Sequence, residues 1–188
     1  MPSAFTLQVT DADRVFLMAT ARSVILDKLE GREQILSEPS AGCSSVVSME
    51  LGAFVTLEQG GALRGCIGQV VGKGPLYKAV ARMALAAAFD DGRFLPLTRE
   101  EADDVHISIS IMGPIEVCPD PELVEVGRHG LIMQQGARSG LLLPQVAVEW
   151  EWDRNTFLAQ TCRKAGLPAD AWQDAATRIL WFEAVVLK

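Results

Sequence analysis

The chain has 188 residues, of which 49% are hydrophobic and 22% are charged, and its formal net charge is −7 at pH 7. This length suits one domain of ordinary size, or one domain folded as two lobes, and it is sufficient to bury a core. The balanced composition excludes wholesale disorder. The acidic charge argues against nucleic-acid binding, which requires a broad basic surface to neutralise phosphates.

Membrane and export signals are not apparent in the sequence. No apolar run reaches the roughly 18 residues that a membrane-spanning helix requires, and the first residues lack the basic start and apolar stretch of a signal peptide. We therefore expect a cytoplasmic protein without a membrane partner.

The metal-ligating residue types are few and widely spaced. The chain has two histidines, His106 and His129, and no Cys-x-x-Cys or His-x-x-x-His pair. The spacing of the four cysteines indicates neither a zinc finger nor a disulfide framework in a reducing compartment. We expect no metal site and no cofactor. The cysteines are Cys43, Cys66, Cys118 and Cys162.

The first predicted element is an amphipathic helix. Thr10 followed by Asp13 indicates an N-cap with an acidic first turn, and apolar residues then recur at helical spacing until Gly31. Residues 32–48 show no periodicity and are predicted to form a loop, which places Cys43 near the surface. The predicted apolar face of the helix consists of Val15, Met18, Ala21, Ile25 and Leu29.

A β-hairpin is predicted next, in residues 53–70, AFVTLEQGGALRGCIGQV. β-forming residues lie on either side of Gly60 and Gly61, which can adopt the positive φ of a tight turn. The motif LRGCIG, residues 63–68, falls in the second strand. Pro75 then suits the first helical position of an alanine-rich helix ending near Gly92. Its predicted apolar face is Leu76, Val80, Met83 and Ala87.

The second half of the chain is predicted to contain a strand, a hairpin, a helix and a final strand. Residues 105–112 alternate strictly, with His106 on the polar face. The hairpin covers 130–146, with Gly136 and Gly140 at its turn, and the closing strand covers 178–188. In the helix, residues 154–165, Cys162 lies on the apolar face and is predicted to be core.

The two predicted hairpins are weakly similar to each other. The segments from Gln59 and from Gln134 both run turn, strand and Gln-Val, and each is later followed by a helix. Chance similarity explains this as well as an ancient duplication does. The pattern would suit two similar lobes facing a cleft.

Four blocks, in order, connect the sequence to a known family: LRGCIG, AAFDDGRFLPL, GRHGLIMQQGARSGLLLPQVAVEWEWD, and FLAQTCRKAGLP with Trp172. These blocks resemble the AMMECR-type domain, called system protein A in the bacterial AmmeMemoRadiSam group. The matching segments run from about Phe54 to the C-terminus, and we identify residues 1–188 as a single AMMECR-type domain. Gly92 stands where we expect proline, and Glu151 where a small residue is commoner.

The resemblance implies both a fold and a biological context. The implied fold is α+β, an antiparallel barrel-like sheet with flanking helices, forming one domain of two lobes around a cleft that contains LRGCIG. The implied partners are a Memo-like protein and a radical S-adenosylmethionine protein of a shared modification pathway. The resemblance predicts no particular substrate or activity, because none is agreed for the family.

The motif LRGCIG supports two interpretations. In an extended strand, Arg64 and Cys66 would share one face about 6.5–7 Å apart, close enough for the guanidinium to favour a thiolate. Alternatively, Cys66 is a small packing residue and Arg64 pairs with a carboxylate across the sheet. In either case alternation predicts that Leu63, Gly65 and Ile67 face the core, opposite Arg64, Cys66 and Gly68.

Four further residues are candidates for the same site. Gly65 and Gly68 would allow a ligand or a backbone to approach closely. Arg93 either binds an anion or pairs with Asp91 to shape a turn, with Phe89 and Phe94 driven inward. His129 is either an acid or base in the cleft or a surface histidine.

The leading hypothesis is a cytosolic binding or adaptor component of an AmmeMemoRadiSam-like pathway, holding a small ligand or a partner peptide. Its candidate ligand-binding residues are Arg64, Gly65, Gly68, Arg93 and His129. The alternative is an enzyme with Cys66 as a nucleophilic or redox residue assisted by Arg64, although no adjacent base is identifiable. A structural or self-associating protein is the third hypothesis.

Overall fold

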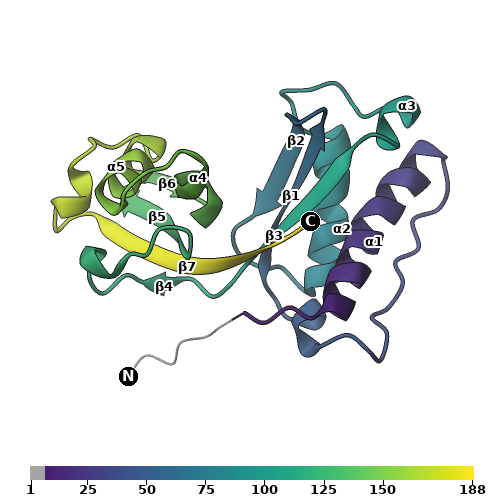
Figure 1. Cartoon of the computed structure of the whole chain (residues 1–188), viewed down its shortest axis with the longest axis horizontal. Coiled ribbons are helices and arrows are strands. Elements are labelled where there is room, and N and C mark those ends of the chain that lie inside the picture. Colours follow the sequence, from purple (N-terminus) through teal and green to yellow (C-terminus); the bar gives the residue numbers. More distant parts are fainter. Residues whose placement is uncertain (1–6) are drawn as a thin grey trace. The chain divides into compact units, whose positions relative to one another are not determined.

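The computed structural model describes residues 7–188, which divide into two compact units. Gln8–Met112 with Val185–Lys188 form the N-terminal unit, and Gly113–Ala184, to which Leu7 also belongs, form the C-terminal unit. Each unit combines antiparallel strands with helices (Figure 1), which confirms the predicted α+β class. No helix in residues 7–188 has the length and apolar character required to span a membrane. The expectation that no export signal begins the chain concerns residues 1–10, of which residues 1–6 lie outside this range.

The N-terminal unit begins with helix α1 (Asp11–Leu29), whose start is capped as predicted. The Thr10 side chain accepts the Asp13 N–H, and the Asp13 carboxylate accepts the Thr10 N–H. Asp13 is fully buried and also accepts hydrogen bonds from the Ser44 N–H and hydroxyl, each at 2.7 Å. Burial would raise the pKa of Asp13, but these hydrogen bonds lower it below its ordinary value. The carboxylate thus fastens the loop after α1 to the start of the helix.

The buried face of α1 differs from the predicted one. Val15 is 64% exposed, so its assignment to the apolar face was wrong. The buried stripe runs through Leu17, which is two residues, or about 200° of helical rotation, away from Val15. The other apolar residues in the stripe are Ala21, Val24 and Ile25.

The first hairpin consists of β1 (Gly52–Gln59) and β2 (Ala62–Gln69), as predicted. Gly60 and Gly61 both have positive φ, 58° and 78°, so the two-residue turn uses glycine at both positions. β1 also pairs with β3 (His106–Met112), giving the antiparallel order β2-β1-β3. β2 is therefore at the edge of this order.

Two helices cover one face of these three strands (Figure 1). α2 (Leu76–Phe89) packs on β1 and β2, and α1 packs on α2 and β3. Pro75 is the N-cap of α2 rather than its first residue, and Met83 is only partly buried. The strand residues buried on the helix side are Ala53, Val55, Leu57, Gly65, Ile107, Ile109 and Ile111. We refer to the opposite side of β1, β2 and β3 as the polar face.

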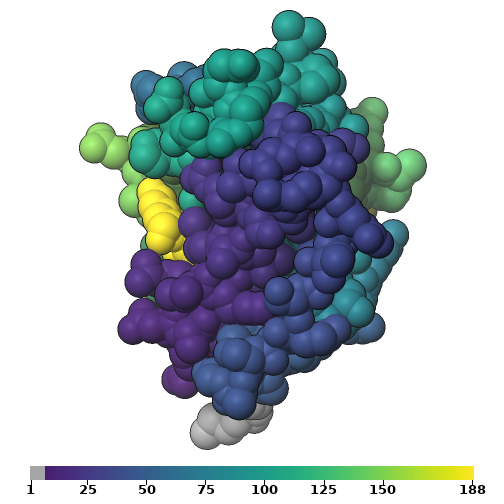
Figure 2. Space-filling model, turned by 90° about the vertical axis from the view of Figure 1, so that its right-hand side faces the viewer, coloured from purple at the N-terminus to yellow at the C-terminus, as the bar shows by residue number. Residues whose placement is uncertain are grey.

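Shorter elements complete the N-terminal unit. They are the 3₁₀ helix η1 (Ser45–Ser48) in the predicted loop and α3 (Arg99–Ala102) after α2. The C-terminal residues lie beside the start of α1 (Figure 2), where the Lys188 carbonyl accepts a hydrogen bond from Arg14 at 3.2 Å.

The C-terminal unit contains the second hairpin, formed by β5 (His129–Gln135) and β6 (Arg138–Leu142). β7 (Arg178–Leu187) begins in this unit, where it pairs with β5 and with β4 (Glu116–Val117). Gly136 has a φ of 58° at the turn, but Gly140 lies within β6, so its assignment to the turn was wrong. A Cβ on Gly140 would lie 2.3 Å from the Ala165 nitrogen, so close packing explains this glycine.

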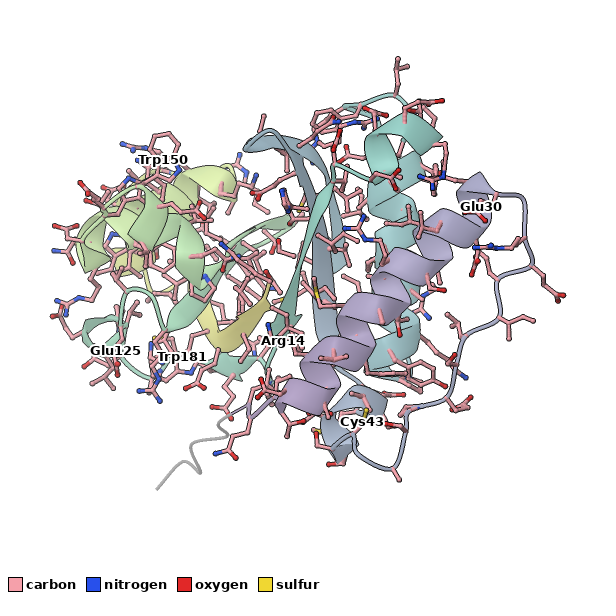
Figure 3. All side chains as sticks on the ribbon, turned by 45° about the vertical axis from the view of Figure 1, so that its right-hand side comes forward. Arg14, Glu30, Cys43, Glu125, Trp150 and Trp181 are labelled. Atoms are coloured by element: carbon pink, nitrogen blue, oxygen red, sulfur yellow. The ribbon has the colours of Figure 1, made fainter. Side chains whose placement is uncertain are left out.

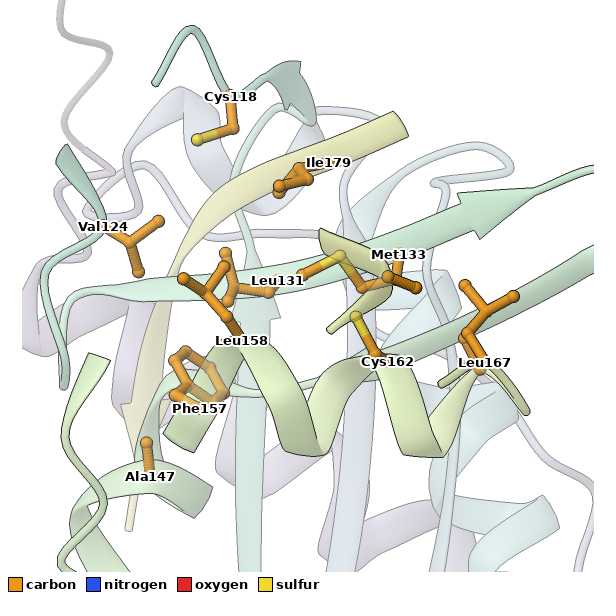
Figure 4. Packing of buried hydrophobic residues seen from close by; sticks show 12 residues of the cluster. Cys118, Val124, Leu131, Met133, Ala147, Phe157, Leu158, Cys162, Leu167 and Ile179 are labelled. Carbon is orange, nitrogen blue, oxygen red and sulfur yellow. The ribbon is translucent and has the colours of Figure 1, made fainter. Parts of the chain in front are cut away.

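Helices cover this second set of strands. They are α4 (Pro144–Glu149) and α5 (Arg154–Lys164), with 3₁₀ helices η2 (Pro121–Leu123) and η3 (Ala171–Gln173). Gly166, with a φ of 73°, ends α5 as predicted. Cys162 points into a cluster with Phe157 and Leu158 (Figure 4), and all three are fully buried. The prediction that Cys162 belongs to the core is confirmed.

Candidate functional site

A β-bulge divides the LRGCIG motif. Leu57 faces Gly65, but the next residue of β1, Glu58, faces Leu63, so Arg64 is an extra residue in β2. The bulge interrupts the alternation, so Leu63, paired with Glu58 and 43% exposed, lies on the polar face together with Cys66. The prediction that Leu63 faces the core was therefore wrong. Ile67, opposite the buried Val55, faces the helices but is only partly buried.

Cys66 lies on the polar face in a row of small polar side chains. Thr56 is its cross-strand neighbour on β1, and Ser108 is the neighbour of Thr56 on β3. The Thr56 hydroxyl donates a hydrogen bond to the Cys66 sulfur at 3.2 Å. Cys66 is partly exposed, whereas Cys162 is fully buried. The Cys66 side chain is thus directed away from the helix-covered core of its unit.

Asp91 and Arg93 hold the main chain of Cys66. The Cys66 N–H donates to Asp91 Oδ2 at 2.9 Å, and the Cys66 carbonyl accepts from Arg93 Nη2 at 3.3 Å. Both groups point away from β1, so Thr56 and Cys66 form a non-hydrogen-bonded pair, the kind in which side chains come closest. The loop after α2 therefore takes the place of a neighbouring strand beside Cys66.

The two residues that hold Cys66 also form the predicted ion pair. Arg93 Nε and Nη2 donate to the Asp91 carboxylate at 2.9 and 2.7 Å. The bonds from the Arg93 side chain and from the Cys66 N–H keep the pKa of Asp91 well below its ordinary range. The Asp91 side chain is 4% exposed and that of Arg93 is 56% exposed. The expected inward placement of Phe89 and Phe94 is only partial, since both are partly buried.

Arg64 binds a carboxylate of α3. Its Nε and Nη2 donate to the two carboxylate oxygens of Glu101 at 2.8 and 3.0 Å, a bidentate ion pair. The Arg64 side chain, followed by the Thr98 N–H, lowers the pKa of Glu101 to about 2. The Phe94 ring contacts the guanidinium groups of both Arg64 and Arg93, at 5.9 and 5.4 Å from its centroid. The Arg64 charge is therefore engaged by Glu101.

Packing accounts for the two glycines of the motif. A Cβ on Gly65 would lie 2.2 Å from the Ala87 carbonyl oxygen, and one on Gly68 would lie 2.2 Å from the Phe54 ring. The absent side chains thus admit α2 on one face and an aromatic ring on the other. Gly65 and Gly140 play parallel parts in the two hairpins, since each lies against a later helix, which agrees with the weak sequence similarity of the segments.

His129 is the first residue of β5, in the C-terminal unit, and it is 7% exposed. Its ring stacks on Trp181 at 4.3 Å between centroids, and its Nδ1 accepts the Glu125 N–H at 3.0 Å. Burial, followed by the positive charge of Arg128, lowers the pKa of His129 below its ordinary value. The expectation of a surface histidine was wrong.

The structure thus gathers Arg64, Cys66, Gly68 and Arg93 along β2 and its covering loop. It adds three participants that the sequence interpretation missed: Thr56, Ser108 and Glu101. A signal for Glu101 was present, since Thr98 and Glu101 form a capping box. Within residues 7–188, no group of three or more His, Cys, Asp and Glu residues is arranged to hold a metal ion.

Comparisons with known proteins agree with the resemblance. The AMMECR1 family model matches residues 18–187. A protein from Thermococcus onnurineus is 42% identical over 183 residues, covering 92% of this chain and 88% of that protein. A protein from Aquifex aeolicus is 40% identical over 177 residues, covering 90% and 89%.

A solved structure is similar over nearly the whole chain. The crystal structure of an uncharacterized protein from Pyrococcus horikoshii, PH0010, has a TM-score of 0.84 and 40% sequence identity, covering 96% of this chain and 93% of that one. These matches confirm the resemblance drawn from LRGCIG and the blocks after it. The chain belongs to the AMMECR1 family.

Proposed function

We propose that this chain is a cytosolic binding component that holds a small ligand or a partner peptide on the polar face around Cys66. The observation that carries the proposal is the placement of Cys66. Its side chain is partly exposed beside Thr56, while Asp91 and Arg93 fix its main chain from the loop side. A residue held in this way presents a sulfur atom at a defined position.

The polar face offers several groups to a ligand. Thr56, Cys66 and Ser108 form one row across the three strands, and the exposed Glu58 and His106 face each other in the next row. Hydroxyl groups both donate and accept hydrogen bonds, which suits amide or carbonyl groups of a ligand. Such a ligand requires no covalent chemistry from the protein.

Arg64 and Arg93 have a supporting role in this proposal. Each guanidinium is engaged by a carboxylate, and together they surround Phe94 next to the strand. They stabilise the edge on which Cys66 lies. Gly65 and Gly68 contribute by close packing, and His129 contributes by ordering the C-terminal unit.

A second candidate function is Cys66-dependent catalysis. The fixed main chain and the Thr56 hydroxyl at 3.2 Å from the sulfur favour it, since both orient a nucleophile. A thiol nucleophile also requires a base. Within residues 7–188, the one group hydrogen-bonded to the Cys66 sulfur is the hydroxyl of Thr56. Binding therefore agrees better with the geometry.

The family context supplies the proposed partners. In AmmeMemoRadiSam-like systems, they are a Memo-like protein and a radical S-adenosylmethionine protein acting in one modification pathway. A binding component would present a ligand or a peptide segment to these proteins.

Affinity selection from a small-molecule cell extract, read by mass spectrometry, tests the proposal. The wild type is compared with Cys66→Ala and with Cys43→Ala, a control at another partly exposed cysteine. We expect compounds retained by the wild type and by Cys43→Ala, with at least tenfold lower retention by Cys66→Ala. Equal retention by all three proteins would contradict a site at Cys66. The same comparison with the purified Memo-like protein as bait tests the peptide version.

A further inference from the structure

The C-terminal unit carries an exposed tryptophan outside the Cys66 site. Trp150 ends α4 and is 68% exposed (Figure 3). Its ring stacks on Trp152 with centroids 6.2 Å apart and planes at 20°. Trp152 is partly buried against the core cluster of the unit. The Trp150 ring therefore packs on Trp152 and exposes aromatic surface to solvent.

Two exposed carboxylates flank Trp150 along the chain. Glu149 and Glu151 are exposed on either side of Trp150 in the chain. Glu151 has a φ of 52°, a conformation that favours glycine, and its N–H bonds the Val148 carbonyl at 3.1 Å. The chain thus turns sharply at Glu151 and returns Trp152 to the core.

The charge at this surface is uncompensated. Among the ion pairs found in residues 7–188, none involves Glu149 or Glu151, whereas Glu122 pairs with Arg154 and Glu125 pairs with Arg128. A purely apolar partner would remove these carboxylates from water without replacing their hydration, which is costly. A cation would compensate them.

The same chemistry applies to the aromatic ring. Tryptophan is the best aromatic acceptor for a lysine or arginine side chain over its face, and it is enriched among residues that dominate interfaces. We infer that Trp150, with Glu149 and Glu151, forms a contact site for a partner segment that carries lysine or arginine.

This site does not depend on the function proposed for the polar face. All of its residues belong to the C-terminal unit, whereas Cys66 and its neighbours belong to the N-terminal unit. An experiment can therefore contradict the Trp150 site without contradicting the Cys66 site, and the reverse also holds.

A fluorescein-labelled hexalysine peptide is the probe, and anisotropy at low salt measures its binding to the whole chain. We expect Trp150→Ala to weaken binding about fivefold or more. Glu149→Gln/Glu151→Gln should weaken it at least as much. The matched control is Glu33→Gln/Glu50→Gln, which removes the same charge from two exposed positions of the N-terminal unit that take part in none of the ion pairs found in residues 7–188. Unfolding midpoints near that of the wild type verify that each variant is folded.

Three outcomes would overturn the inference. If both double variants weaken binding equally, general charge attraction accounts for the result. If Trp150→Ala binds hexalysine as the wild type does, the ring takes no part. If the wild type does not bind the peptide, the inference is wrong, and a dimer that Trp150→Ala abolishes would then show that a second copy of the chain occupies the surface.

Discussion

The backbone N–H of Cys66 donates to the Asp91 carboxylate at 2.9 Å, so a side chain does what a neighbouring strand would otherwise do at the edge of the sheet. Arg93 completes the arrangement by donating to the Cys66 carbonyl. An edge strand with free polar groups invites pairing with another chain, and this loop prevents that at Cys66. It also sets the direction in which the thiol points.

Asp91→Asn should lower the free energy of unfolding and make that free energy depend less on pH in the acid range. The pKa of Asp91 lies well below its ordinary value of 3.8, so its contribution is complete above that value and is lost as the pH falls toward the depressed pKa. Between about pH 5 and 2, unfolding of the wild type should take up as much as about one proton more than unfolding of the variant. Urea unfolding across this range measures the difference. Asp90→Asn, at an exposed neighbouring position, should show the same change of unfolding free energy with pH as the wild type. If this pH dependence is identical in the two variants, the prediction is contradicted.

Cys66→Ser and Cys162→Ser should differ in their cost. The partly exposed Cys66 has the Thr56 hydroxyl beside it, so a serine there remains hydrogen-bonded and costs less than about 1 kcal/mol. Cys162 is fully buried among apolar side chains, where a hydroxyl costs about 1–3 kcal/mol. Urea denaturation midpoints give both values. Equal losses would place Cys66 in the core rather than on an open face.

Gly65→Ala should destabilise the protein by about 2 kcal/mol or more, because its Cβ would meet the Ala87 carbonyl oxygen, 2.2 Å away, and backbone cannot yield as a side chain can. Gly92→Ala is the control, since open space surrounds that position. It should be neutral or stabilise by about 0.4–1 kcal/mol. Thermal unfolding of both variants is sufficient. If Gly65→Ala is as stable as the wild type, a role in ligand approach becomes the better explanation of this glycine.

His129 should make the protein less stable in mild acid. Its pKa in the folded state is lowered from 6.5 by burial, so the unfolded chain binds more protons and stability falls as the pH drops below about 6.5. The loss amounts to about 1.4 kcal/mol for each pH unit by which the pKa is lowered. His129→Gln should remove this dependence between pH 7.5 and 5, while His106→Gln, at an exposed position, should retain it. An unchanged profile in His129→Gln would show that another group titrates.

Local patterns predicted the secondary structure well, and packing between distant segments explains where they failed. Gly60 and Gly61 specify a two-residue turn, and the alternation of residues 105–112 specifies a strand, although Ser110 and Met112 on its more polar side are buried as well. No local sequence pattern indicates the bulge at Arg64. A regular hairpin from that turn would pair Cys66 with Val55, whereas the bulge pairs it with Thr56. Leu63 pairs with Glu58 in either register and lies on the polar face, so the bulge is what brings Cys66 to that face as well.

The candidate site was predictable in part. The Asp91–Arg93 pair is local, two residues apart, and was expected from the sequence. The hydrogen bond from the Cys66 N–H to Asp91 joins residues 25 apart in the chain, and it depends on how α2 packs on β2. The Arg64–Glu101 pair likewise depends on tertiary placement, across 37 residues.

The most direct test of the account is the iodoacetamide labelling rate of Cys66 in the folded protein, with and without a saturating amount of the ligand or partner retained by affinity selection. Peptide mapping follows each cysteine separately, and Cys43 serves as the internal control because it is partly exposed in the loop after α1. The account predicts that the bound ligand slows labelling of Cys66 at least about tenfold and leaves the rate at Cys43 unchanged. An unchanged rate at Cys66 under saturation would contradict a binding site on this face.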